Sequence, residues 1–173
     1  MAQSVDASKD RPSDPRNREV VHPSEGDPQR GNLETPINAS GLSKWFINSQ
    51  PGYRPGLTPF RRGFDVGLVQ GLWVIIPFTK LGPLRDTDVA NIAGLLSAIG
   101  LSVIATAAIW LYAASNPPNP EPTVTTPRPP VELNTSAGWF QYGNGFLVGA
   151  ISGVTITYFV LANWGVLQSL FNK

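Results

Sequence analysis

Residues 58–81 read TPFRRGFDVGLVQGLWVIIPFTKL, and this stretch sets the architecture of the chain. Pro59 is suited to the first position of a helix, and residues 66–79 form a continuous uncharged segment. About 20 helical residues at about 1.5 Å each cover about 30 Å, which is the thickness of the hydrocarbon layer of a bilayer. We therefore predict a membrane-spanning helix over about residues 59–78.

Two further stretches, residues 89–120 and 133–172, contain no charged residue. Only 14% of the whole chain is charged, against about 25% in ordinary soluble domains. Uncharged apolar stretches of this length are typical of transmembrane helices, and we place the second span at about 91–114 and the third at about 142–163. The predicted fold class is an all-α membrane protein with three transmembrane helices.

The rest of the chain is predicted to form a tail and a loop. Residues 1–56 read as a long polar N-terminal tail with one short helix, and residues 57–173 as the three-helix transmembrane domain. Ser40 is suited to cap the short helix. The helix lies either at the membrane interface or on protein, and one of its faces gathers Leu42, Trp45 and Phe46. Residues 116–130, NPPNPEPTVTTPRPP, predict an extended polyproline-like loop between two spans.

The distribution of charge predicts the orientation of the chain in the membrane. Three spans place the two termini on opposite sides. Most of the Lys and Arg residues lie in the N-terminal tail. Because cytoplasmic segments carry an excess of these residues, we expect the N-terminus on the cytoplasmic side.

Small residues recur every four positions in all three spans. This spacing lets another helix, or a flat ring, approach the backbone closely inside a membrane. The first and third spans use glycine alone, and we call these two sets the glycine seams. They consist of Gly63, Gly67 and Gly71, and of Gly145, Gly149 and Gly153.

The residue types exclude most enzymatic and nucleic-acid-binding functions. The chain has no cysteine, and its one histidine, His22, lies in the polar tail. Thiolate-held iron–sulfur clusters and a bis-histidine haem within the membrane are therefore excluded. The net charge of +1, with no basic stripe and interleaved aromatics, gives no sign of nucleic-acid binding. Because the spans hold no pair of carboxylates, we predict that the chain is not an enzyme.

Asp65 and Gln70 are the strongly polar side chains of the first span. An ionisable group there is a functional hypothesis, since its insertion costs about 2.5–3.5 kcal/mol. Asp65 has two possible roles. It either forms an ion pair with Arg61 or Arg62, one turn earlier, or donates an oxygen to a metal such as tetrapyrrole magnesium. In the second case the flanking glycines would leave room for the ring. Gln70 lies about 140° around the helix, so the two cannot hold one ion together. An interhelical hydrogen bond is the other role open to Gln70.

Three segments resemble subunit XI of cyanobacterial photosystem I, the PsaL family. They are GDPQRGNLETPINASGL at 26–42, PGYRPGLTPFRRGFDVGLVQG at 51–71 and KLGPLRDTDVAN at 80–91. The resemblance runs from about residue 14 to the end of the chain. It implies three transmembrane helices at the periphery of photosystem I in the thylakoid membrane. The implied partners are the core subunits PsaA and PsaB, small subunits such as PsaI and PsaM, and PsaL copies of neighbouring monomers in trimers or tetramers.

The resemblance also implies pigments and a metal ion. The family's first helix typically reads RGLEVGMAHG, in which the glutamate and the histidine ligate chlorophyll magnesium. Here the string is RGFDVGLVQG, which places Asp65 and Gln70 at those positions. The implied cofactors are chlorophyll a, beta-carotene and calcium, and the residues do not decide between chlorophyll a and chlorophyll f. The calcium site carries over to Asp86 and the carbonyl of Pro83; the alternative for Asp86 is a solvated loop charge.

These observations predict a non-catalytic membrane subunit of photosystem I. It would mediate contacts between monomers, with the glycine seams providing close helix packing, and it would bind one or more antenna chlorophylls and carotenoid. The two changed ligand types suggest a divergent copy made under particular conditions. Two alternatives stay open, a pigment-free assembly or scaffold protein and a small transport subunit in which Asp65 faces a polar pathway.

Overall fold

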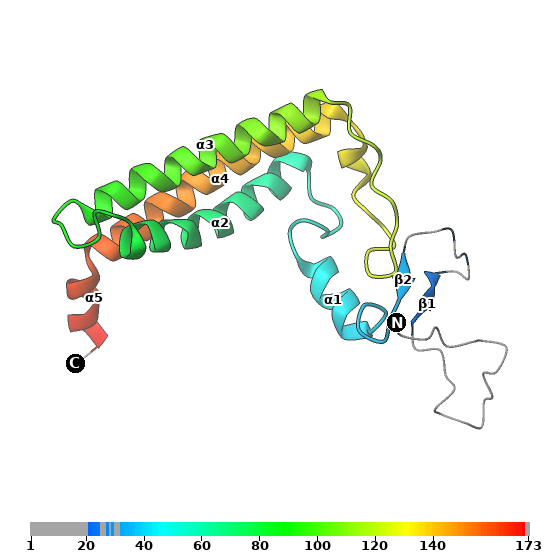
Figure 1. Cartoon of the computed structure of the whole chain (residues 1–173), viewed down its shortest axis with the longest axis horizontal. Helices are drawn as coiled ribbons and strands as arrows, with labels where there is room; N and C mark the ends of the chain where they lie inside the picture. The colour runs from blue at the N-terminus through cyan, green and yellow to red at the C-terminus, as the bar shows by residue number, and fades with distance from the viewer. Residues whose placement is uncertain (1–20, 25–26, 28, 30–31, 172–173) are drawn as a thin grey trace, which may run out of the picture. The chain divides into compact units, whose positions relative to one another are not determined.

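The computed structural model describes residues 21–24, 27, 29 and 32–171 (Figure 1). Residues 1–20 of the expected N-terminal tail lie outside the described residues. The chain divides into two compact units. One holds residues up to Tyr53 together with Glu121–Pro129, and the other holds Arg54–Pro120 with everything from Pro130 onward.

The first unit is built around one short helix. α1 (Gly41–Ser49) begins after Ser40, whose side chain accepts a hydrogen bond from the Ser43 backbone N–H, as the sequence predicts. Two-residue strands, β1 (His22–Pro23) and β2 (Leu33–Glu34), pair antiparallel. The apolar face of α1 is exposed: the exposed fractions of Leu42 and Trp45 are 74% and 67%. Nothing in the described part of the chain covers this face.

The proline-rich loop does more than join two spans. The Asn48 side-chain amide donates to the backbone carbonyl of Thr125 at 2.8 Å, and the Thr125 hydroxyl donates to the carbonyl of Asn38 at 3.1 Å. These two bonds attach Glu121–Pro129 to α1 and to the turn before it. The segment therefore belongs structurally to the first unit, although its prolines keep it free of helix, as predicted.

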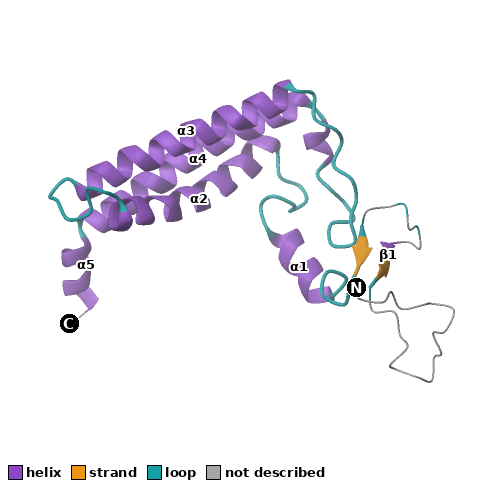
Figure 2. Ribbon diagram, viewed as in Figure 1, coloured by secondary structure: helices purple, strands orange, loops and turns teal. Residues whose placement is uncertain are grey.

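The second unit contains three helices long and apolar enough to cross a membrane, among the residues described. They are α2 (Pro59–Leu81), α3 (Ala90–Ala114) and α4 (Ser136–Ala162). Figure 2 shows them side by side as the dominant helical part of the molecule. The predicted fold class is confirmed, and the short β1–β2 ladder adds to it.

The ends of two spans differ from the predicted ones. α2 begins at Pro59 as expected, with Thr58 as its cap, but it continues through Pro77 to Leu81, where Gly82 ends it. α4 begins six residues earlier than predicted, because the Thr135 side chain accepts a hydrogen bond from the Gly138 backbone N–H at 3.0 Å and caps the helix there. A break at Asn163 separates α4 from α5 (Trp164–Phe171).

α2 and α4 run in the same direction and pack backbone to backbone. A Cβ added at Gly67 would collide with the carbonyl oxygen of Phe146 and lie 2.9 Å from the amide nitrogen of Ala150. A Cβ added at Gly149 would collide with the carbonyl oxygen of Phe64 in the same way. The Thr157 hydroxyl also donates to the backbone carbonyl of Leu72 at 3.0 Å. The two helices therefore approach as closely as glycine allows.

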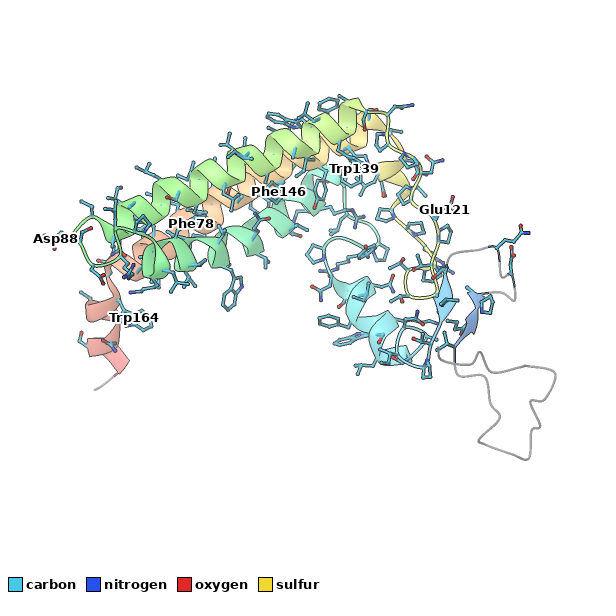
Figure 3. All side chains as sticks on the ribbon, in the orientation of Figure 1. Phe78, Asp88, Glu121, Trp139, Phe146 and Trp164 are labelled. Carbon is cyan, nitrogen blue, oxygen red and sulfur yellow. The ribbon has the colours of Figure 1, made fainter. Side chains whose placement is uncertain are left out.

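α3 completes the unit by packing against both of the other helices. Ile75 of α2, Ala98 of α3 and Val154 of α4 are fully buried together. The small residues that recur every four positions along α3 are buried; they are Gly94, Ala98, Ser102 and Thr106. Aromatic side chains lie near both ends of α4: Figure 3 labels Trp139 in its first turn and Trp164, the first residue of α5. Such residues are typical of the two membrane interfaces.

Candidate functional site

The candidate pigment ligand Asp65 lies on a face of α2 that the glycine seams do not use. Its Oδ1 is 2.9 Å from Nε of Arg61, and 21% of its side chain is exposed. Of the two arginines that the sequence offered as partners, the structure therefore selects Arg61. The guanidinium of Arg61 also lies over the ring of Phe64, 5.7 Å from the ring centroid. One oxygen of the Asp65 carboxylate is therefore already engaged in an ion pair.

The surface beyond Asp65 is apolar and exposed. One and two helical turns further along α2 lie Val69 and Trp73, which are 51% and 70% exposed. A carboxylate at the edge of an uncovered apolar face matches what a magnesium-bearing chlorin needs, an oxygen donor beside a hydrophobic contact surface. Asp65 and its surroundings fit such a group. Gln70 is half-buried on another part of α2, so the structure does not bring the two predicted ligands together.

The glycine seams serve the first of the two uses that their spacing allows, the close approach of another helix. The glycines of α2 and α4 are buried against each other inside one chain. These faces are therefore not open to a flat ring or to a neighbouring monomer, because helix spacing identifies a close-packing face but not the partner that packs on it. Any pigment on α2, and any contact between monomers, must use other surfaces.

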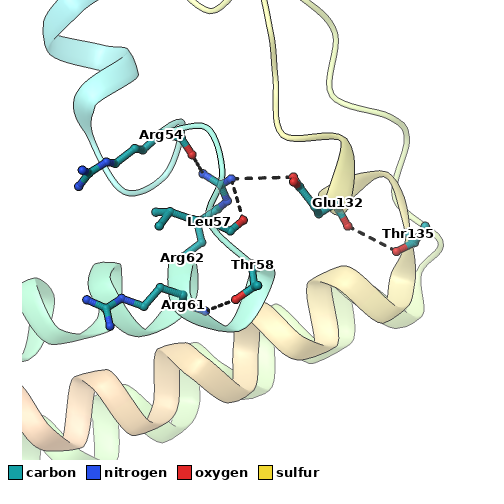
Figure 4. Close-up of polar contacts among 7 residues, drawn as sticks. All are labelled: Arg54, Leu57, Thr58, Arg61, Arg62, Glu132 and Thr135. Carbon is teal, nitrogen blue, oxygen red and sulfur yellow. Dashed lines mark hydrogen bonds and ion pairs between the residues drawn. The ribbon is translucent and has the colours of Figure 1, made fainter.

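Arg62 holds together the entrances of two spans (Figure 4). Only 1% of this residue is exposed. Nη1 donates to the backbone carbonyl of Arg54 at 3.0 Å and Nη2 to that of Leu57 at 3.4 Å. Nη2 is also 3.9 Å from Oε2 of Glu132, in the short 3-10 helix η4 (Val131–Asn134) that precedes α4. The guanidinium therefore links the segment before α2 to the segment before α4.

The candidate calcium ligands lie in the turn between α2 and α3. The Asp86 side chain is 83% exposed, and its Oδ2 is 3.3 Å from Nε of Arg85. Among the described residues there is no group of three or more His, Cys, Asp or Glu side chains that could hold a metal ion. Calcium takes six to eight oxygen ligands. Asp86 and the carbonyl of Pro83 supply two, so this turn alone does not make a calcium site.

Sequence patterns did not show where two polar side chains lie, those of Arg62 and Asn144. Arg62 is next to Arg61 in an arginine pair, and only the fold shows that one side chain points outward and the other inward. Asn144 is an exposed amide within α4. It is visible in the sequence as an amide inside an uncharged span, but the face it occupies becomes known only when the partner of Gly145 is known.

Comparison with known proteins gives one consistent result. A family model described as photosystem I reaction centre subunit XI, PsaL, matches residues 20–166. The chain is 60% identical to the photosystem I reaction center subunit XI of Nostoc punctiforme over 99% of both chains. It is 57% identical to the protein of the same name from Mastigocladus laminosus, again over 99% of both, and 44% identical to that of Thermosynechococcus vestitus over 89% of this chain and 98% of the relative.

Proposed function

The chain belongs to the photosystem I reaction centre subunit XI family, PsaL. From that premise we propose that it is a non-catalytic thylakoid subunit. We propose that it binds antenna chlorophyll through Asp65 and mediates contacts between photosystem I monomers. Membership of the family and the three spanning helices make it a membrane subunit of photosystem I. The individual pigment ligands, the neighbouring subunits and the oligomeric contacts are the parts that we propose.

The pigment proposal is carried by the position of Asp65. The ion pair with Arg61 engages Oδ1, and a carboxylate has a second oxygen that can donate to magnesium. Val69 and Trp73 supply the exposed apolar surface against which a ring and its phytyl tail would lie. A chlorophyll held there would supply light absorption and excitation transfer. Carotenoid would share the same outward faces of the helices, as the general composition of photosystem I suggests.

Gln70 is proposed as the ligand of a second pigment. An amide oxygen is a weaker donor than an imidazole nitrogen, so we expect this pigment to be held directly by the amide or through a water. Gln70 is half-buried at the edge of the contact with α4. This position also suits a hydrogen bond between helices, which is its alternative role.

We expect Asp65→Leu to remove one chlorophyll per subunit, because leucine offers no oxygen donor. Asp65→Asn keeps an oxygen and should retain the pigment at reduced occupancy. Arg61→Met is the matched control, since it removes the ion pair of 2.9 Å but leaves the carboxylate. The measurement is a map of the purified complex that resolves chlorin rings, with low-temperature difference absorption. Pigment retained in Asp65→Leu would show that Asp65 serves only the ion pair.

We also propose that Asp86 and the Pro83 carbonyl bind calcium only where another chain completes the site. The remaining oxygens would come from a neighbouring monomer and from water. In that case Asp86→Ala, or removal of calcium with a chelator, should lower the fraction of trimers or tetramers on a native gel while the amount of subunit per monomer stays the same. Asp88→Ala, two residues away in the same turn, is the control. Equal oligomer fractions in both variants would leave Asp86 as a solvated charge.

The remaining proposals follow from the family and from charge. The N-terminus lies on the cytoplasmic side, and the partners are PsaA, PsaB, small subunits such as PsaI and PsaM, and copies of this chain. A pigment-free scaffold is the second candidate function; it predicts unchanged pigment content in every variant above. A small transport subunit has less support, because Asp65 is paired with Arg61 and borders the apolar side chains Val69 and Trp73.

A further inference from the structure

α1 carries its apolar residues on the side that the rest of its unit leaves open. Exposed and partly buried residues alternate in pairs along the helix, which places them on opposite sides of it. The partly buried side holds Lys44 and Asn48, and the Asn48 amide donates to the proline-rich loop at 2.8 Å. The exposed side gathers Leu42, Trp45 and Phe46. An amphipathic helix of a globular protein turns its apolar face to the core instead.

The residue types of this apolar face suit the boundary between lipid and water. Besides Leu42, Trp45 and Phe46, the exposed positions of α1 are Gly41 and Ser49, so the face carries no charge. Tryptophan is enriched at the level of the lipid head groups, where its ring is buried and its N–H stays near water. With 9 residues α1 is about 14 Å long, too short to span a bilayer but long enough to lie in its surface.

The chain keeps α1 close to the membrane. Because the three spans alternate in direction, α2 begins on the side of the membrane where α3 ends and α4 begins. Arg62, in the first turn of α2, donates to the carbonyl of Arg54 at 3.0 Å and so holds Arg54 at that side. Only residues 50–53 separate Ser49 from Arg54. Five steps of at most about 3.6 Å let α1 end no further than about 18 Å from Arg54.

The charges around α1 favour a negatively charged surface. Residues 35–62 contain four basic residues and no acidic one. Arg62 is buried and Arg61 is paired with Asp65, whereas Lys44 and Arg54 form no ion pair with any described residue. Basic side chains beside an inserted apolar face strengthen the binding of a helix to anionic lipids.

We propose that α1 lies in the head-group layer of the membrane, with Leu42, Trp45 and Phe46 inserted into anionic lipid. The helix anchors the first unit of the chain to the bilayer. Through the bond from Asn48 to Thr125 it also anchors the proline-rich loop between α3 and α4. The proposal requires a membrane subunit but neither the pigment ligands nor the contacts between monomers proposed above. A protein surface covering the same face is the alternative that the experiment must separate.

The first test uses the absence of cysteine from the chain. Leu42→Cys and Lys44→Cys each place one nitroxide label on α1, about 160° apart around the helix. Intact photosystem I carrying either label is embedded in nanodiscs of phosphatidylglycerol, and the signal of equally treated unmodified complex is subtracted. Electron paramagnetic resonance then measures how far each label is accessible to oxygen, which concentrates in lipid, and to a nickel chelate, which stays in water.

We expect the ratio of oxygen to nickel accessibility to be at least about threefold higher for Leu42→Cys than for Lys44→Cys, because only the first label enters lipid. Two results would overturn the proposal. A Leu42→Cys label accessible to nickel would show that the apolar face lies in water. A Leu42→Cys label closed to both reagents would show that protein covers it.

The second test concerns the charge of the lipid. In the Leu42→Cys complex, the added changes Lys44→Gln and Arg54→Gln should raise nickel accessibility in phosphatidylglycerol. They should leave it unchanged in phosphatidylcholine, which has no net charge. Lys80→Gln, at the other end of α2 and so on the opposite side of the membrane, is the control. Nickel accessibility in phosphatidylglycerol that does not respond to Lys44→Gln and Arg54→Gln would contradict the assignment of an anionic surface.

Discussion

Gly149→Leu should separate α2 from α4 and remove the subunit from photosystem I. The Cβ of any residue at this position would collide with the carbonyl oxygen of Phe64 and lie 2.9 Å from the amide nitrogen of Leu68. Both are backbone atoms, so no side-chain rotation relieves the collision. Overpacking a core costs about 1–3 kcal/mol where side chains can shift, and we expect more than about 3 kcal/mol here. The measurement is the amount of subunit in purified complexes, which should fall at least tenfold.

Gly100 provides the matched control for this prediction. It lies in α3, and a Cβ added there would meet nothing within 4 Å. Gly100→Leu should therefore leave the amount of subunit unchanged. Alanine substitutions at the same two positions make the test sharper. Gly100→Ala should be neutral or stabilising, because alanine has the higher helix propensity. Gly149→Ala should already lower the amount of subunit in purified complexes. Equal effects at the two positions would show that α2 and α4 are not packed through the glycine seams.

The fold was predictable because its strongest signal, three long uncharged apolar stretches, can be read directly from the sequence. Length, apolarity and absence of charge define three spans without any knowledge of neighbours. The starts and ends of the helices were less predictable, since they depend on single hydrogen bonds. The Thr135 side chain caps α4, which begins six residues before the predicted start, and α2 continues three residues past its predicted end at Phe78, to Leu81.

The candidate site was predictable only in its residue types. Asp65 was identified as a carboxylate in a span, and its pairing with Arg61 was one of the two pairings that helical spacing allows. The purpose of the glycine seams was not predictable, because a face made for close packing has the same sequence whether it meets a ring, a neighbouring monomer or a helix of its own chain. The partner is a property of the three-dimensional packing, and here it is the other seam.

Arg62→Met should be the most harmful change to a charged residue of this chain. Arg62 is 1% exposed and donates to the carbonyls of Arg54 and Leu57, at 3.0 and 3.4 Å. Hydrogen bonds to a charged group contribute about 1.5–3 kcal/mol each, and both of these part-buried bonds would be lost. We expect a loss of about 3 kcal/mol, measured as a lower temperature for release of the subunit from heated photosystem I on native gels.

Two further variants separate the hydrogen bonds of Arg62 from its ion pair. Glu132→Gln removes only the contact of 3.9 Å with a carboxylate that is 38% exposed, and such pairs contribute about 0–1 kcal/mol. Arg62→Lys keeps the charge but lacks the planar fork that reaches two carbonyls at once. We therefore expect the release temperature of the subunit to fall most in Arg62→Met, less in Arg62→Lys and least in Glu132→Gln. If Glu132→Gln were as harmful as Arg62→Met, the ion pair rather than the two carbonyl contacts would hold the entrances of α2 and α4 together.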